Sequence, residues 1–241
     1  MSLRRAFWRT YRRVKRRVLG VPDTRTVDFG HLRRLEPFGR HFGEDRGQAL
    51  DRYYIEGFLG AAAADVRGRV LEIGEDRYTR QFGGDRVTHS DIPHVNTSNP
   101  RATIVGDLSA APQIPDASFD TLIITQTLHL IYDPIAAVRT MHRVLKPGGV
   151  LLLTVPGITQ IPNGTQWADT WYWAFTPQSV RRMLAEAFGD SGVAVTSHGN
   201  VLSATSMLYG LSASDLTTEE LNESDPDYPV IIGARARREG A

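Results

Sequence analysis

Residues 150–155 read VLLLTV, a run that is apolar on both of its alternating faces. A strand with one solvated face would alternate between apolar and polar residues. A strand that is apolar on both faces must be covered on both sides, which is typical of the centre of a parallel sheet between two layers of helices. This run therefore indicates an α/β fold.

Strand and helix patterns alternate on either side of this run. Further strands are predicted at residues 69–74, 86–91, 102–106, 119–125, 193–197 and 228–235. Helices are predicted at 47–64, 134–145, 176–188, about 203–210 and 217–222. Strands interleaved with helices predict a doubly wound, mostly parallel seven-stranded sheet with helices on both faces, a Rossmann-like arrangement.

The first twenty residues differ from the rest of the chain. They hold eight basic residues and no acid, and Leu3, Phe7, Tyr11, Val14 and Val18 recur at helical spacing. Residues 1–20 are therefore predicted to form a basic amphipathic helix or arm, for which an anionic membrane surface is one candidate partner. A solvated arm, a helix packed on the domain and a nucleic-acid contact are the alternatives. Residues 21–46 are predicted to be an irregular lead-in to one domain at 47–241.

Composition narrows the function classes. The sequence has no cysteine, which excludes disulfides, a thiol nucleophile and cysteine-bound metal. No stretch is apolar for long enough to span a bilayer, and residues 1–20 lack the apolar centre of a secretory signal. Without residues 1–20 the chain is net acidic, so no nucleic-acid partner is expected. We expect a cytoplasmic protein, with peripheral attachment at the inner face of the membrane through residues 1–20 as an alternative.

Acidic residues end three successive predicted strands. Glu72 closes the first strand and Gly74 follows it, Asp91 ends the second strand, and Asp107 with Leu108 follows the third. Ligands of such sheets bind at the carboxyl ends of the strands. Glu72 is a candidate acceptor for a ligand ammonium, Asp91 for ribose hydroxyls and Asp107 for an adenine amine. For each residue, a turn or a solvated acid is the structural alternative.

Five segments carry a resemblance to a known family: VLEIG at 70–74, HSD at 89–91, GDLSAAPQIPDASFD at 106–120, TQTLHLIYDP at 125–134 and RVLKPGGVLLLTVP at 143–156. In this order and spacing they resemble the class I S-adenosylmethionine-dependent methyltransferases. The resemblance implies that S-adenosyl-L-methionine is the cofactor. It also implies that Glu72 and Gly74 face its methionine part, Asp91 its ribose and Asp107 with Leu108 its adenine. Gln126 would lie near the sulfonium.

One segment departs from that family. The first strand is usually followed by a run with two more glycines, whereas Glu75-Asp76-Arg77-Tyr78 follows Gly74 here. The loop either takes another path around the same cofactor or weakens its binding. Across the whole chain, the pattern also resembles a looser group of bacterial methyltransferase-like proteins that is often associated with surface glycan synthesis.

The candidate bases are histidines and an aspartate. His129 follows the fourth predicted strand and is the preferred general base, with His94 and Asp133 as the other candidates. A segment rich in tryptophan and tyrosine at 166–173 is a candidate cover for a sugar or aromatic acceptor. The seven histidines have no metal-ligand spacing, so no metal site is predicted.

The sequence therefore predicts an S-adenosylmethionine-dependent methyltransferase that acts on a small-molecule or glycan acceptor, at oxygen. Two alternatives stay open: a methyltransferase fold that serves as a non-catalytic binding or assembly module, and another enzyme that uses the same cofactor on this scaffold.

Overall fold

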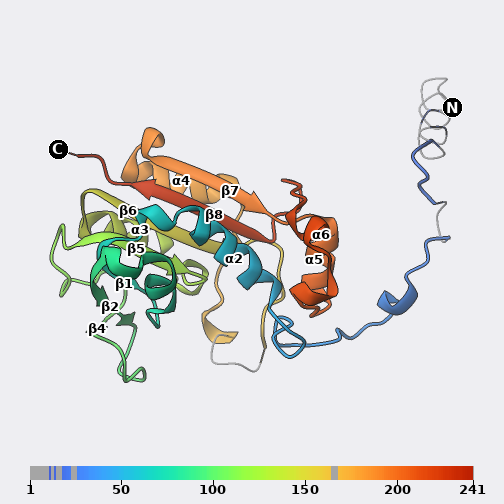
Figure 1. Cartoon of the computed structure of the whole chain (residues 1–241), viewed down its shortest axis with the longest axis horizontal. Helices are drawn as coiled ribbons and strands as arrows, with labels where there is room; N and C mark the ends of the chain where they lie inside the picture. The colour runs from blue at the N-terminus through green and yellow to red at the C-terminus, as the bar shows by residue number, and fades with distance from the viewer. Residues whose placement is uncertain (1–10, 12–13, 15–17, 23–25, 164–167, 241) are drawn as a thin grey trace. The chain divides into compact units, whose positions relative to one another are not determined.

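The structure is a computed structural model that describes residues 11, 14, 18–22, 26–163 and 168–240. The expected helix at residues 1–20 lies mostly outside the described residues. Contacts divide the chain into two units, residues 1–36 and 37–241. In the first unit, η1 (Gly30–Leu32) is one turn of 3-10 helix. The second unit begins earlier than the domain start predicted at residue 47, and it is shown in Figure 1.

Six strands form the main sheet of the second unit, in the order β2-β1-β5-β6-β8-β7. Their bounds are β1 (Gly68–Glu72), β2 (Val87–Asp91), β5 (Phe119–Thr125), β6 (Leu145–Pro156), β7 (Val193–His198) and β8 (Ile231–Arg237). The pairs β1·β2, β1·β5 and β5·β6 are parallel, and β8 runs antiparallel to β6 and β7. The mostly parallel sheet expected from the sequence is confirmed.

The strand count differs from the predicted seven. The segment 102–106 yields only β4 (Ile104–Val105), which pairs with β3 (Pro93–His94) in a separate two-stranded sheet. The chain bends between β2 and β3 at Ile92. Before the bend β2 pairs with β1, and after it β3 pairs with β4. Pro93 begins the second half and lacks the N–H that an unbroken ladder would use. The predicted third strand thus pairs with the bent end of the second and is separate from the main sheet.

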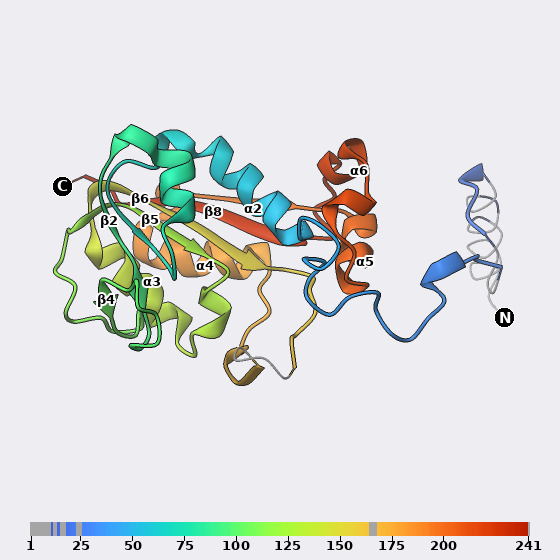
Figure 2. The same ribbon diagram turned by 60° about the horizontal axis from the view of Figure 1, so that its bottom comes forward.

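Helices cover both faces of the sheet. Figure 2 shows α2 (Leu50–Ala61) on one side and α3 (Pro134–Val144) with α4 (Pro177–Phe188) on the other. The short helices α5 (Val201–Leu208) and α6 (Thr218–Asn222) follow β7. Single turns complete the unit: η2 (Ala63–Asp65), the π-helix η3 (Thr79–Gly83), η4 (Gly84–Arg86), η5 (Leu128–Leu130), η6 (Ala168–Thr170), η7 (Asp190–Gly192) and η8 (Ala213–Asp215).

Side chains of β6 point alternately into two cores. Leu151, Leu153 and Val155 pack in the core under α3 and α4, whereas Val150 and Leu152 pack in the core under α2. All five are buried. This arrangement confirms that residues 150–155 form a central strand covered on both sides.

Local sequence explains where α3 and α4 begin. Asp133 accepts the N–H of Ala136 at 2.9 Å, and Pro134 occupies the first turn. Thr176 accepts the N–H of Ser179 at 3.1 Å, and the Ser179 hydroxyl accepts the N–H of Thr176 in return. Such caps satisfy backbone donors that have no partner within the helix, and proline fits a first turn because its missing N–H is not needed there.

The segment 37–46 is joined to the segment 209–215 by close backbone contacts. The N–H of Phe38 donates to Tyr209 O at 2.8 Å, and Arg46 forms a paired hydrogen bond with Asp215 at 3.1 and 2.8 Å. A Cβ atom on Gly210 would lie 2.0 Å from Gly39 O, and Gly210 has a φ of +69°. Glycine is therefore required at this crossing both for its backbone conformation and for the space.

Gly210→Ala is expected to lower the free energy of unfolding by about 2–4 kcal/mol, because it adds a backbone clash to an unfavourable φ. Gly84→Ala is the matched control: its φ of +53° is also positive, but its Cβ would meet nothing within 4 Å. The control should cost only about 1 kcal/mol. Urea denaturation of both variants measures the difference, and equal losses would show that the crossing tolerates a methyl group.

Candidate active site

Glu72 ends β1 and is buried in spite of its charge. Its two carboxylate oxygens accept the backbone N–H groups of Tyr78 at 3.0 Å and Thr79 at 2.7 Å. Burial raises the pKa of Glu72, and these two hydrogen bonds only partly oppose that rise. The carboxylate therefore anchors the start of η3, in addition to standing at the strand end where the sequence predicts a ligand contact.

Gly74 follows β1 in a left-handed conformation. Its φ is +78°, and a Cβ atom there would meet nothing within 4 Å. The backbone at this point therefore faces open space, which is the condition for close approach of a ligand.

The loop that follows β3 is hydrogen-bonded to the loop that contains Gly74. The side chain of Asn99 donates to Gly74 O at 2.7 Å, and the guanidinium of Arg101 contacts the carboxylate of Asp76. Arg80 donates to the same carboxylate at 2.7 Å. Burial opposes ionisation of Asp76, but the two arginines outweigh it and lower its pKa. The two contacts made by Asn99 and Arg101 join the loops that follow β1 and β3, and we call them the loop clasp.

Asp91 ends β2, directly beside Leu71 of β1. Only 4% of this residue is exposed. One carboxylate oxygen accepts from Arg69 Nε at 2.8 Å, and the other accepts from the Thr103 hydroxyl at 3.0 Å. A carboxylate has about four acceptor positions, so each oxygen retains one for a further donor.

Asp107 and Leu108 lie in different surroundings. Asp107 is exposed, and its Oδ1 accepts the N–H of Ser109 at 2.8 Å, which makes an Asx turn. Its Oδ2 has no hydrogen-bond partner among the described residues. Leu108 is buried in the core on the side of α3, so its side chain packs inside the protein.

Gln126 follows β5 with a φ of +47°, a conformation that residues other than glycine rarely adopt. Its N–H donates to Thr154 O at 2.9 Å, which holds it beside β6. Strained backbone of this kind persists only where neighbours enforce it, and it gathers at functional sites. The sequence placed Gln126 near the reacting centre but gave no sign of this strain.

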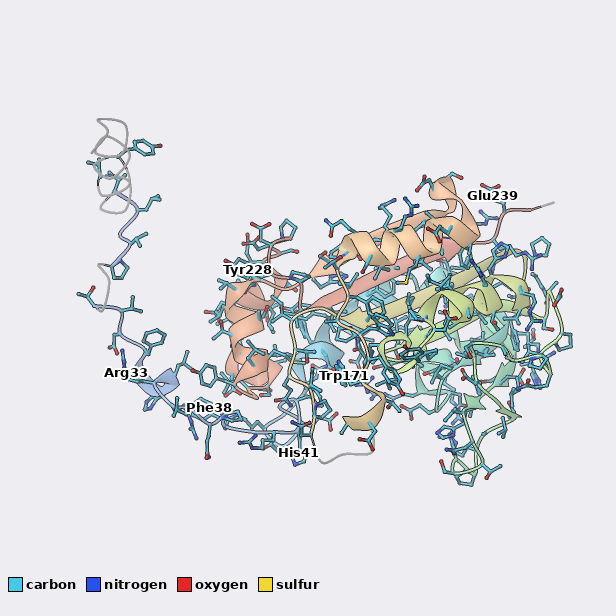
Figure 3. The ribbon with its side chains drawn as sticks, turned by 180° about the vertical axis from the view of Figure 1, so that it is seen from behind. Arg33, Phe38, His41, Trp171, Tyr228 and Glu239 are labelled. Atoms are coloured by element: carbon cyan, nitrogen blue, oxygen red, sulfur yellow. The ribbon has the colours of Figure 1, made fainter. Side chains whose placement is uncertain are left out.

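His129 lies in η5 and is buried, with 2% exposed. Its ring centroid is 4.3 Å from that of Trp171, which Figure 3 labels in the segment after β6. Its Nδ1 has no hydrogen-bond partner. Burial lowers the pKa of His129 from its ordinary value of 6.5 to about 4. The imidazole is therefore neutral at pH 7 and holds an unused buried polar atom.

The other two candidate bases have structural partners. His94 Nδ1 lies 2.9 Å from Asn96 O, and Asp133 caps α3. Arg69 and Asn99 bind the predicted residues Asp91 and Gly74, and Arg101 binds the neighbouring Asp76, but none of the three could be predicted from the sequence. Arginine and asparagine in loops are common, and no spacing in the sequence links them to Asp91, Gly74 or Asp76.

Among the residues that the structure describes, no group of three or more histidines and acids is placed to hold a metal ion. Within the same residues, no helix has both the length and the apolar character needed to cross a bilayer.

Residues 71–153 match the family model described as a methyltransferase domain. This segment contains Glu72, Gly74, Asp91, Asp107 and Gln126. This part of the chain is therefore similar to S-adenosylmethionine-dependent methyltransferases.

A relative of similar sequence is a protein of Mycolicibacterium smegmatis named "Probable S-adenosylmethionine-dependent methyltransferase". It is 33% identical over 102 residues, which cover 42% of this chain and 35% of that protein. The chain thus matches about a third of the length of this curated relative.

Solved structures share the fold. A methyltransferase of Thermotoga maritima aligns over 81% of this chain and 95% of its own, with 15% identity and a TM-score of 0.51. One from Mesorhizobium loti aligns over 79% and 98%, with 18% identity and the same TM-score of 0.51. The 4+2 cyclase SpnF aligns over 81% and 85%, with 18% identity and a TM-score of 0.51.

Acid should destabilise the protein through His129. Because its folded pKa is depressed, the unfolded chain binds the proton more tightly, and stability is lost as the pH falls below 6.5 toward 4. From pH 6.5 to 4.5 this group should remove about 2 kcal/mol from the free energy of unfolding. His129→Phe should lose that much less stability over this range, measured by urea denaturation at each pH. His41→Phe, at an exposed position, is the control, and identical pH profiles for wild type and His129→Phe would contradict the prediction.

Proposed function

We propose that the protein transfers a methyl group from S-adenosylmethionine to an oxygen atom of a small-molecule or glycan acceptor. The observation that carries the proposal is the set of residues at successive strand ends: Glu72 at the end of β1 with Gly74 after it, Asp91 at the end of β2, and Asp107 after β4 of the separate two-stranded sheet. All of them lie within the segment that matches the methyltransferase domain.

The residues fit a nucleoside cofactor in three respects. Gly74 leaves open space beside its backbone, Asp91 keeps acceptor capacity on both oxygens, and Asp107 presents a carboxylate oxygen without a partner among the described residues. In the proposed arrangement Asp91 binds the ribose hydroxyls and Asp107 the adenine amine. Leu108 is buried in the core, so we assign it the role of fixing Asp107 and not that of covering the adenine.

When bound, the cofactor supplies a sulfonium whose methyl group is already activated. The protein must therefore bring the acceptor oxygen into line with that methyl group and accept its proton. Gln126 is held rigidly at the end of β5, which suits a positioning role. His129 is neutral at pH 7 and its Nδ1 has no partner, but the ring is buried against Trp171, so its use as the base requires that the acceptor hydroxyl reach this buried atom. His94 and Asp133 are weaker candidates, because both already have structural partners.

A second candidate function is a binding or assembly module without methyl transfer. The loop clasp favours it, because Asn99 and Arg101 hold a neighbouring loop against Gly74 and Asp76, where a glycine-rich loop would leave room for the cofactor. A third candidate is another reaction on this scaffold. The 4+2 cyclase SpnF has the same fold, so the fold by itself permits more than one chemistry.

Residues 1–20 carry a separate proposal, which is binding to an anionic membrane surface. Deletion of these residues should abolish sedimentation of the protein with phosphatidylglycerol vesicles and leave cofactor binding unchanged. Unaltered sedimentation of the shortened protein would contradict the membrane contact.

The decisive test of the proposed function is calorimetric titration of S-adenosylhomocysteine into the protein. We expect a dissociation constant in the micromolar range and a weakening of about tenfold or more in Asp107→Ala, because a hydrogen bond to a charged group is lost. Asp107→Asn keeps a side-chain oxygen that accepts the Ser109 N–H, so the turn is preserved while the charge is removed. Weaker binding by this variant would assign the loss to the ligand contact and not to the turn. Asp116→Ala removes another exposed aspartate, one that pairs with Arg143, and should bind like wild type.

If binding is confirmed, release of S-adenosylhomocysteine from S-adenosylmethionine in the presence of hydroxylated acceptors measures methyl transfer. Absence of binding at millimolar ligand would show that the loop clasp closes the site, and the binding-module function would replace the proposed one.

A further inference from the structure

Three aromatic side chains gather on the surface beside the candidate active site. Tyr132, Tyr172 and Trp173 have exposed fractions of 73%, 46% and 38%. Tyr132 comes from the loop before α3, and the other two come from the segment before α4. Single exposed aromatic residues are common, but three in contact on one surface indicate a binding site. We call these three residues the aromatic cluster.

The rings of the aromatic cluster contact one another at steep angles and are partly exposed. Tyr132 meets Tyr172 edge to face, with centroids 5.3 Å apart and ring planes at 82°. Trp173 lies 6.4 Å from Tyr132 and donates its indole N–H to Ile131 O at 3.0 Å. That hydrogen bond fixes the indole ring and uses its only donor, so the ring contributes a surface for stacking.

The aromatic cluster is joined directly to His129. The N–H of Tyr172 donates to His129 O at 3.0 Å, and Trp171, the preceding residue, has its ring 4.3 Å from the His129 ring. A molecule that rests on the aromatic cluster therefore lies next to the segment that follows β5, where Gln126 and His129 are placed.

The chemistry of the aromatic cluster selects one class of ligand. The hydroxyls of Tyr132 and Tyr172 form no hydrogen bond with any described residue, so flat apolar faces stand beside free polar groups. Its charged sequence neighbours are the acids Asp133 and Asp169. Anionic lipid headgroups would be repelled by these acids, whereas the ring of a neutral sugar has C–H faces to stack and hydroxyls to bond.

We propose that the aromatic cluster is a carbohydrate subsite that holds the ring of a neutral sugar acceptor. The subsite rests on the proposed function for its role in methyl transfer, but sugar binding itself does not depend on the cofactor. It narrows the acceptor from a small molecule or glycan to an uncharged saccharide and identifies the residues that hold it.

Saturation-transfer NMR on the full chain tests the subsite with maltotriose, mannotriose and cellotriose as probes, without cofactor. We expect saturation transfer from the protein to at least one of them. Tyr132→Ala and Tyr172→Ala should each weaken its binding roughly three- to tenfold, the range given by loss of one aromatic contact. Tyr132→Phe should retain most of the stacking. Tyr228→Ala, at an exposed tyrosine outside the aromatic cluster, is the matched control and should bind like wild type.

Thermal unfolding of each variant separates loss of binding from loss of fold. No transfer to any of the three sugars, or equal binding by wild type and both alanine variants, would overturn the subsite. Sedimentation with phosphatidylcholine vesicles that depends on Tyr132, without sugar binding, would also overturn it and make the aromatic cluster a membrane contact. Calorimetry with S-adenosylhomocysteine is independent of these results: cofactor binding without sugar binding refutes the subsite alone, and sugar binding without cofactor binding refutes the proposed function alone.

Discussion

The central strand β6 is the constraint on which the rest of the fold depends. Its side chains enter the core under α3 and α4 and the core under α2, so neither layer of helices can be removed without exposing it. Its neighbours β5 and β8 satisfy its backbone hydrogen bonds on either edge. With both faces and both edges occupied, β6 fixes the position of β5, and β5 in turn fixes β1. The carboxyl ends of these strands carry Glu72 and Gln126, so the candidate site is positioned by the most deeply buried part of the molecule.

The helical and central parts of the fold could be predicted from the sequence because local patterns determine them. The apolar run at residues 150–155 requires two covering layers, and Asp133-Pro134 and Thr176-Pro177 define the starts of α3 and α4. The seventh strand could not be predicted correctly. Its two paired residues, Ile104 and Val105, look like a strand, but their partner is decided by the bend at Ile92-Pro93, which depends on tertiary contacts.

Positions of site residues were more predictable than their environments. Strand ends are visible in the sequence, so Glu72, Asp91 and Gln126 could be placed. Their partners come from other loops: Arg69 and Thr103 for Asp91, and the N–H groups of Tyr78 and Thr79 for Glu72. The burial of His129 under Trp171 joins segments separated by α3, β6 and the segment that follows β6, and no periodicity encodes that contact.

The position of Glu72 has a consequence for any ligand that reaches the end of β1. Each of its oxygens already accepts one N–H at the start of η3, so a cationic ligand group that attracts this carboxylate shares it with residues 78 and 79. Ligand binding and the local order of this turn then form one coupled equilibrium. The measured affinity therefore depends on the order of this turn, and substitutions within η3 will change affinity without touching the ligand.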